Sequence, residues 1–260
     1  MSSSVPEERV RTLSRLFAAQ RIKSNAIRFE GKHIGGHAFA ARLFGGQTAT
    51  QTRLASIRLF PDRDVLSLKL NFTAPGNVIA PLDYLFTEVP DTNFLIVNVW
   101  QNGKQIATAK LFVGSRDEVL SHTIYRMPNV RNPLAYPSLK EEMKSRIDST
   151  PLNNLTALVD SDLFELRPVD FDHFATEARR PHSLLVWVTV GLSYRSQDRM
   201  RDADGISILI LASDHLAMHT AMINYANFGR VEDYQVGGSL CHTVNFHCLD
   251  DVDVNVSCFH

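Results

Sequence analysis

Apolar and polar positions in the first half of the chain predict a strand, a helix and then a series of strands. Residues 26–31 predict a short strand, and a glycine-rich stretch leads to a helical segment at residues 48–60 that is nearly uncharged at its start. Residues 64–74 alternate with a period of two, and residues 81–90 predict the next strand. One predicted face of that alternation is apolar, with Leu66, Leu68, Leu70 and Phe72, and the other carries Val65, Ser67 and Lys69.

Residues 94–114 contain two apolar runs joined at Asn102-Gly103, which predicts a β-hairpin. Both turn residues accept positive φ, as a type I′ turn requires. One strand, one central helix and several antiparallel strands make an α+β arrangement in which a curved sheet wraps a single helix. We expect this arrangement to form an N-terminal domain over residues 1–115.

Residues 116–161 lose that regularity and are predicted to form a linker. Prolines interrupt the segment repeatedly, and its one helix candidate is the charged stretch 138–147. Beyond the linker the alternation resumes in a second domain, residues 162–260, that looks like a degenerate copy of the first. Its predicted strands are residues 163–171, 183–193, 239–247 and 252–259.

Composition and charge are those of an ordinary globular protein. Of the 260 residues, 44% are hydrophobic and 21% charged, and 27 Lys plus Arg balance 28 Asp plus Glu. Because the chain has no excess of positive charge, we expect no nucleic-acid partner. The charged N-terminus lacks the apolar core of a signal peptide. We therefore expect an intracellular protein, cytosolic or peroxisomal, although the C-terminus matches no peroxisomal signal.

The apolar segment 206–228 holds the candidate residue that carries most of the chemistry, Asp214. The segment is long enough to suggest a membrane span, but its polar residues argue against one. We expect a buried helix together with the strand or loop that leads into it. Asp214 is the one formally charged residue between Asp204 and Arg230. Two interpretations are open: Asp214 caps the following helix, or it is a perturbed carboxylate that acts as a general base.

Cysteines and histidines gather near the C-terminus and superficially suggest a metal site. They are Cys241, Cys248, Cys258, His242, His247 and His260. If residues 239–247 form a strand, Cys241 and His247 lie about 20 Å apart, beyond the reach of one zinc ion. We therefore expect no metal site, and interpret these residues as buried thiols and ordinary polar histidines.

Several motifs occur together in an order that resembles the acyl-CoA thioesterase II family, whose members are double-hotdog thioester hydrolases. They are RLFGGQTATQ and WQNGKQIATAKLFV in the first half, and FELRPVDF, ILASDHL and SLCHTVNFH in the second. The resemblance covers roughly residues 28–114 and 164–247. It implies an α+β fold of two hotdog domains, each an antiparallel sheet wrapped around a central helix.

The resemblance also implies which residues hold the hydrolytic water. They are an Asp at a helix start in the second hotdog, a Thr or Ser on the next strand, and a Gln near the C-terminus. Asp214 matches the first position and Ser239 the second, while Cys241 stands where relatives commonly have an Asp. No residue corresponds to the Gln, because relatives continue for two more strands.

We therefore expect the second hotdog to be incomplete at its C-terminus. Three explanations are open: an alternative gene product that is weakly active or inactive, a homo-oligomer in which a partner chain completes the sheet, or a truncated gene prediction.

Thioester hydrolysis needs an activated water and donors for the oxyanion that forms when the water adds. We expect Asp214 to accept the water's proton and Ser239 to fix its direction. A serine nucleophile is not expected, since the chain has no GxSxG motif. The residues expected to contact the substrate are Gly45, Gly46, Gln47 and His215. For His215, a hydrogen-bonded core histidine is the open alternative.

The leading hypothesis is an acyl-CoA thioesterase that releases free fatty acid and CoA by direct water attack, with acyl-CoA as its partner and no cofactor. The alternative is a catalytically impaired acyl-CoA-binding or interaction protein that retains the double-hotdog fold. A hotdog hydratase is a weaker third hypothesis, because no His and Asp pair has the spacing expected for it.

Overall fold

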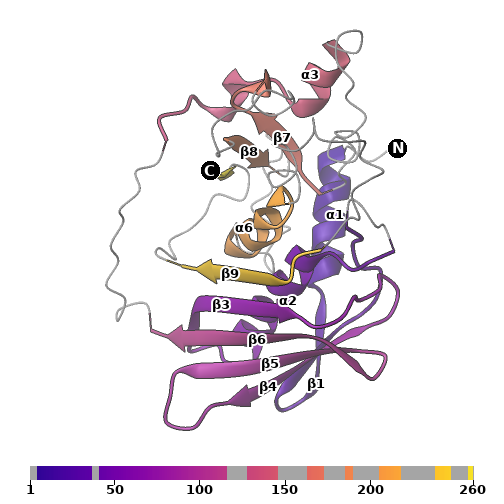
Figure 1. The fold of residues 1–260 in the computed structure, drawn as a ribbon, viewed down its shortest axis with the longest axis vertical. Coiled ribbons are helices and arrows are strands. Elements are labelled where there is room, and N and C mark those ends of the chain that lie inside the picture. The colour runs from indigo at the N-terminus through magenta and orange to yellow at the C-terminus, as the bar shows by residue number, and fades with distance from the viewer. Residues whose placement is uncertain are drawn as a thin grey trace.

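The computed structural model describes residues 5–36, 41–115, 128–145, 163–172, 185–189, 205–217, 238–246 and 257–259. Its helices are α1 (Val5–Phe17), α2 (Gly45–Leu59), α3 (Leu139–Ser145) and α6 (Gly205–Ser213), with a 3₁₀ turn, η2, at Pro133–Ala135. Its strands are β1 (Ala19–Lys23), β2 (Ala26–Phe29), β3 (Asp64–Phe72), β4 (Leu82–Glu88), β5 (Phe94–Gln101), β6 (Lys104–Gly114), β7 (Glu165–Pro168), β8 (Val186–Thr189), β9 (Cys241–Asn245) and β10 (Ser257–Phe259). Figure 1 shows α2 and α6 between the large sheet and the strands β7 and β8.

The large sheet is antiparallel and has the strand order β1-β2-β4-β5-β6-β3-β9. Its strand β9 comes from the second half of the chain and pairs with β3, where Leu70 lies opposite His242. The second sheet, also antiparallel, has the order β10-β8-β7. The strands predicted in both halves are therefore present, and one of them joins the two halves into a continuous sheet.

Strand β3 departs from the predicted alternation at its start. Leu68 and Leu70 are fully buried and Lys69 is exposed, as the period of two requires. Val65, placed by the alternation on the polar face, is buried at 1% exposure. The pairing with β6 shifts register between Val65 and Ser67, so the residues before this irregularity change face.

The hairpin between β5 and β6 forms at the predicted turn. Asn102 and Gly103 both have positive φ, at 52° and 74°. These values are those of a type I′ turn, whose twist matches that of the flanking strands.

Helix α2 begins three residues before the predicted helical segment, so that Gly45, Gly46 and Gln47 form its first turn. It packs against β2 and β3, and it is buried along most of its length although many of its residues are polar. Gln51 shows how such a residue is accommodated. Its amide donates to the backbone oxygen of Leu16 at 2.7 Å and accepts from the Tyr84 hydroxyl at 2.9 Å. Both ends of this buried amide are therefore satisfied.

The helix α1 and strand β1 were not predicted from the sequence. Leu13, Leu16 and Phe17 of α1 are buried at a spacing of three and four residues, the signal of an amphipathic helix. The side chains of Gln51 and Arg58 on α2 donate to the backbone oxygens of Leu16 and Phe17. These bonds satisfy carbonyl groups that a helix leaves open at its C-terminal end.

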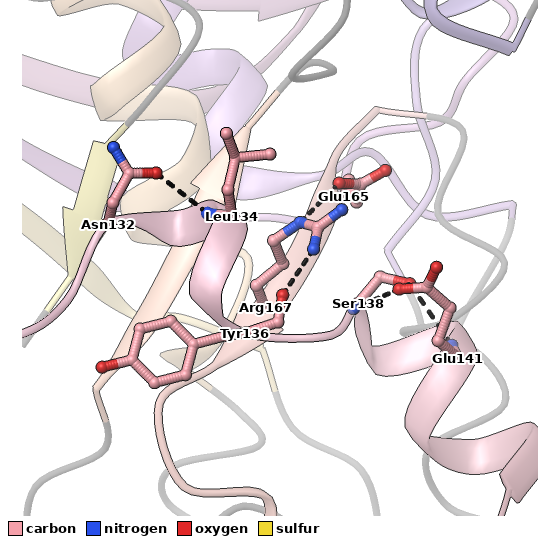
Figure 2. A network of polar contacts seen from close by, with 7 residues as sticks. All are labelled: Asn132, Leu134, Tyr136, Ser138, Glu141, Glu165 and Arg167. Atoms are coloured by element: carbon pink, nitrogen blue, oxygen red, sulfur yellow. Dashed lines mark hydrogen bonds and ion pairs between the residues drawn. The ribbon is translucent and has the colours of Figure 1, made fainter.

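The described part of the predicted linker is ordered against the second sheet (Figure 2). Arg167 of β7 donates to the backbone oxygen of Tyr136 and forms an ion pair with Glu165 at 2.8 Å. Ser138 and Glu141 make a capping box at the start of α3, because each accepts from the other's backbone N–H, at 3.3 and 2.7 Å. The predicted helix at 138–147 is thus confirmed as α3.

Helix α6 corrects the prediction for the apolar segment around Asp214. Residues 205–213 form a helix rather than a strand or loop, and Asp214 follows its last residue. The helix that Asp214 was expected to cap would continue beyond Ala217, outside the described residues, so that interpretation stays a prediction. Burial against α2 outweighs the low helix propensity of its three isoleucines. No helix in the described residues is long and apolar enough to cross a membrane.

Candidate active site

Four segments meet around Asp214. They are the C-terminal end of α6, the N-terminal end of α2, the end of β3, and the residues that lead into β9. The backbone N–H of Phe72, the last residue of β3, donates to the oxygen of Leu240 at 3.0 Å and ties the segment before β9 in place. The candidate site is therefore built at the junction of the two halves.

Asp214 and Ser239 are brought together by this junction. The Ser239 hydroxyl donates to Oδ1 of Asp214 at 2.9 Å, across 25 residues of sequence. Both side chains are partly exposed rather than fully buried, so the carboxylate keeps access to solvent. The proximity expected of the two residues is present, and their roles in catalysis stay a prediction.

The carboxylate of Asp214 also lies against the first residue of α2. A Cβ added at Gly45 would lie 2.8 Å from Oδ2 of Asp214 and 3.0 Å from the Phe72 ring. The cap residue of α2, Phe44, provides no side-chain hydrogen bond, and the first turn contains no acidic residue. Asp214 therefore supplies a negative charge at a helix end that carries a partial positive charge.

Gly46 permits the close approach of the two central helices. A Cβ at this position would lie 2.7 Å from the backbone oxygen of Leu211 on α6. Further along α2, Arg53 donates to the Ser207 hydroxyl at 3.0 Å, near the start of α6. The helices consequently run antiparallel, and this direction places the end of α6, with Asp214, at the start of α2.

Gln47 fastens a loop to α2 and is fully buried. Its Oε1 accepts from the backbone N–H of Ile34 at 2.7 Å, and its Nε2 lies 2.7 Å from Nδ1 of His33. The other ring nitrogen of His33 lies 3.0 Å from the oxygen of Ala80, which can only accept. His33 is therefore protonated on Nε2, and Nδ1 accepts from Gln47.

This arrangement makes stability depend on pH through His33. Burial lowers the pKa of His33, and the bond to Ala80 and the charge of Glu30 offset the shift only in part. The unfolded chain then binds the proton more readily than the folded protein between the lowered pKa and about 6.5. We expect the free energy of unfolding to be highest above pH 6.5 and to fall by up to about 1.4 kcal/mol per pH unit below it for this one group.

Chemical denaturation at a series of pH values between 5 and 8 measures this effect. The His33→Gln variant cannot titrate at this position, so its unfolding free energy should fall less steeply below pH 6.5 than that of the natural protein. An identical pH slope in the two proteins would exclude His33 as a source of the dependence.

His215 lies in an aromatic environment and is 2% exposed. Its ring packs edge-on against Phe44 at 6.3 Å and Phe164 at 5.2 Å between centroids. Its backbone N–H donates to the oxygen of Ala212 at 3.0 Å and closes the turn after α6. These contacts favour the core interpretation of His215 over contact with a substrate.

His242 and Ser213 belong to the neighbourhood of Asp214 and were not singled out as site residues from the sequence. His242 Nε2 lies 3.0 Å from the Ser213 hydroxyl. Burial lowers the pKa of His242, and the negative charge of Asp214 offsets part of that shift. The sequence signal that could have identified His242 is the alternation of β9, which places His242 on the same face as Val244 and Phe246.

Of the residues considered for a metal site, Cys241 is an exposed free thiol on β9. In the described part of the chain, no group of three or more His, Cys, Asp or Glu side chains is arranged to hold a metal ion. His247, Cys248 and His260 lie outside the described residues, and of Cys258 only the backbone is described.

Comparison with known proteins identifies the fold. The architecture of the described residues is that of the double-hotdog thioesterases. A TesB protein of Mycobacterium avium subspecies paratuberculosis matches with a TM-score of 0.61 and 18% identity, over 94% of this chain and 81% of that one. An acyl-CoA thioesterase II of Mycobacterium marinum matches with a TM-score of 0.59 and 20% identity, over 89% and 76%.

No protein-family model matches the sequence, and no curated protein matches it either. The resemblance to thioesterase II proteins found in the sequence motifs is thus confirmed by solved structures, at the level of the fold.

Proposed function

We propose that this protein hydrolyses acyl-CoA thioesters to a free fatty acid and CoA, with the water held between Asp214 and Ser239. The hydrogen bond of 2.9 Å between these side chains carries the proposal. It joins a carboxylate and a hydroxyl from distant parts of the chain at a partly exposed junction. The thioesterase fold of the neighbours supports the same class of reaction.

Asp214 is the general base of the proposed mechanism. Its Oδ1 is engaged by Ser239, and its Oδ2 faces the start of α2. A water bound to the carboxylate would lose a proton to it while adding to the carbonyl carbon of the thioester. The chain thus needs no covalent acyl-enzyme for this step, and CoA leaves as the thiolate when the tetrahedral intermediate collapses.

The first turn of α2 supplies the proposed oxyanion donors. Backbone N–H groups at the start of a helix have no partner within it and point along the axis toward an anion. Gly45 and Gly46 begin α2 beside Asp214, and neither has a side chain that would block the approach of a carbonyl. Base and donors would then act on the same carbonyl group.

A thiol-detection assay with purified protein tests the proposed function. Incubation with fatty acyl-CoA of several chain lengths should release free thiol and fatty acid in equal amounts. Acyl-CoA that binds to the protein without thiol release would contradict the proposal and would favour a binding protein.

Ser239→Ala removes the hydroxyl that orients the Asp214 carboxylate and its water. We expect kcat to fall by about tenfold or more, since misplacement of a reacting group by a fraction of an ångström already costs rate. Ser239→Thr keeps the hydroxyl and serves as the matched control, with kcat close to that of the natural protein. Steady-state kinetics of the two variants measure the difference, and equal activity of the alanine variant would remove Ser239 from the mechanism.

A further inference from the structure

Two consecutive residues at the end of α6 are each bound by a side chain from the segment around β9. Asp214 accepts from Ser239 at 2.9 Å, and Ser213 lies 3.0 Å from Nε2 of His242. The two residues of the second segment are three positions apart. Together they make a two-point attachment, of which only one point touches the carboxylate itself.

The direction of the bond between Ser213 and His242 follows from the serine hydroxyl. That hydroxyl donates to the backbone oxygen of Ile210 at 2.8 Å, so its single hydrogen is already used. Ser213 Oγ must then accept, and His242 must donate through Nε2–H. In the residues that the structure describes, the buried Nδ1 of His242 finds no hydrogen-bond partner, so Ser213 is the polar contact that orients the ring.

The surroundings of His242 favour a neutral ring with its hydrogen on Nε2, where it can donate to Ser213. On β3 its partner in the register is Leu70, which is fully buried, while the flanking Lys69 is exposed on the outer face. From the end of α6, Asp214 contributes a negative charge, and burial nevertheless lowers the pKa of His242. Near neutral pH, His242 is therefore a fixed N–H donor rather than a cation.

We propose that His242 is a positioning residue for Asp214: by holding Ser213, it fixes the turn after α6 and so the direction of the carboxylate. This inference rests on the proposed thioester hydrolysis. Without the bond to His242, the hydroxyl of Ser239 makes the side-chain bond that remains, among the described residues, from the segment around β9 to Ser213 and Asp214, and the carboxylate can rotate away from the start of α2. In this role His242 contacts neither the hydrolytic water nor the substrate.

Four variants test the proposal in the full-length protein. His242→Leu removes the donor at similar volume, and Ser213→Ala removes the acceptor. His242→Gln restores an N–H close to the position of Nε2, and the double variant Ser213→Ala/His242→Leu completes a mutant cycle. Thr243→Val, on the exposed face of β9, is the control that should keep the natural kcat.

For His242→Leu and Ser213→Ala we expect kcat on acyl-CoA to fall by about tenfold, with KM changed less than about threefold, because position rather than binding is lost. His242→Gln should recover most of the rate, and the double variant should be no slower than the slower single variant. A loss in kcat with little change in KM, and its recovery in His242→Gln, would not arise if His242 merely filled space.

Three results would overturn the positioning role while the natural protein is active. They are an unchanged kcat in His242→Leu, a glutamine variant as slow as the leucine variant, or losses that multiply in the double variant. A natural protein that releases no thiol from acyl-CoA would instead refute the proposed function, and the positioning role with it.

Discussion

Replacing Asp214 by Asn is expected to abolish most thioester hydrolysis. The amide cannot accept a proton from water at neutral pH, and loss of a general base costs about 10²- to 10⁴-fold in rate. Asn keeps an oxygen that can accept from Ser239, so the local hydrogen bond of 2.9 Å need not be lost. The measurement is kcat from thiol release, in variant and natural protein at equal concentration.

Folding of the Asp214→Asn variant is the control for this result. Because the carboxylate is partly exposed and its bond to Ser239 can be kept, the free energy of unfolding should change by less than about 1 kcal/mol. A variant that is folded and hydrolyses acyl-CoA at the natural rate would exclude Asp214 as the base.

The second large effect is expected at Gly46, where an added methyl group would force α2 and α6 apart. The contact of 2.7 Å is to the backbone oxygen of Leu211, which cannot move without the helix. Overpacking of this kind costs about 1–3 kcal/mol, and the roughly 1 kcal/mol that alanine gains over glycine in a helix offsets part of that cost. Gly46→Ala should therefore lower the free energy of unfolding by up to about 2 kcal/mol, measured by urea denaturation.

Gly45→Ala is the matched comparison, one residue away in the same turn. The methyl group there would meet the tip of Asp214 and the ring of Phe72, which are side chains that can move. We expect little change in stability but a loss in kcat of up to about 100-fold, because the carboxylate is displaced. If both variants lost stability equally while Gly45→Ala kept full activity, the placement of Asp214 against α2 would be wrong.

The alternation of apolar residues was enough to predict most of the fold. The strands of both halves and the hairpin at Asn102-Gly103 follow from local pattern and turn chemistry, which act over a few residues. The pairing of β9 with β3 could not be read in this way. It pairs residues that are 170–178 positions apart in the sequence, and only tertiary packing decides such a partner.

The candidate site could be predicted only in part, because its geometry also depends on tertiary packing. Motif resemblance identified Asp214 and Ser239, and the two side chains meet. The local sequence predicted a strand or loop before Asp214, whereas residues 205–213 form α6, and Asp214 reaches from the end of α6 to the start of α2. That geometry depends on the antiparallel packing of α2 and α6. The contribution of His242 likewise required knowing which residue of α6 its strand faces.

Single-turnover hydrolysis in H₂¹⁸O tests the central claim most directly. Protein is used in excess over acyl-CoA. If a water bound to Asp214 attacks the thioester carbonyl directly, the released fatty acid should carry one ¹⁸O atom and CoA should appear as free thiol. The peptide that contains Asp214 should stay unlabelled in mass spectrometry. Label in that peptide, an acyl group retained on the protein, or no thiol release at all would contradict the account.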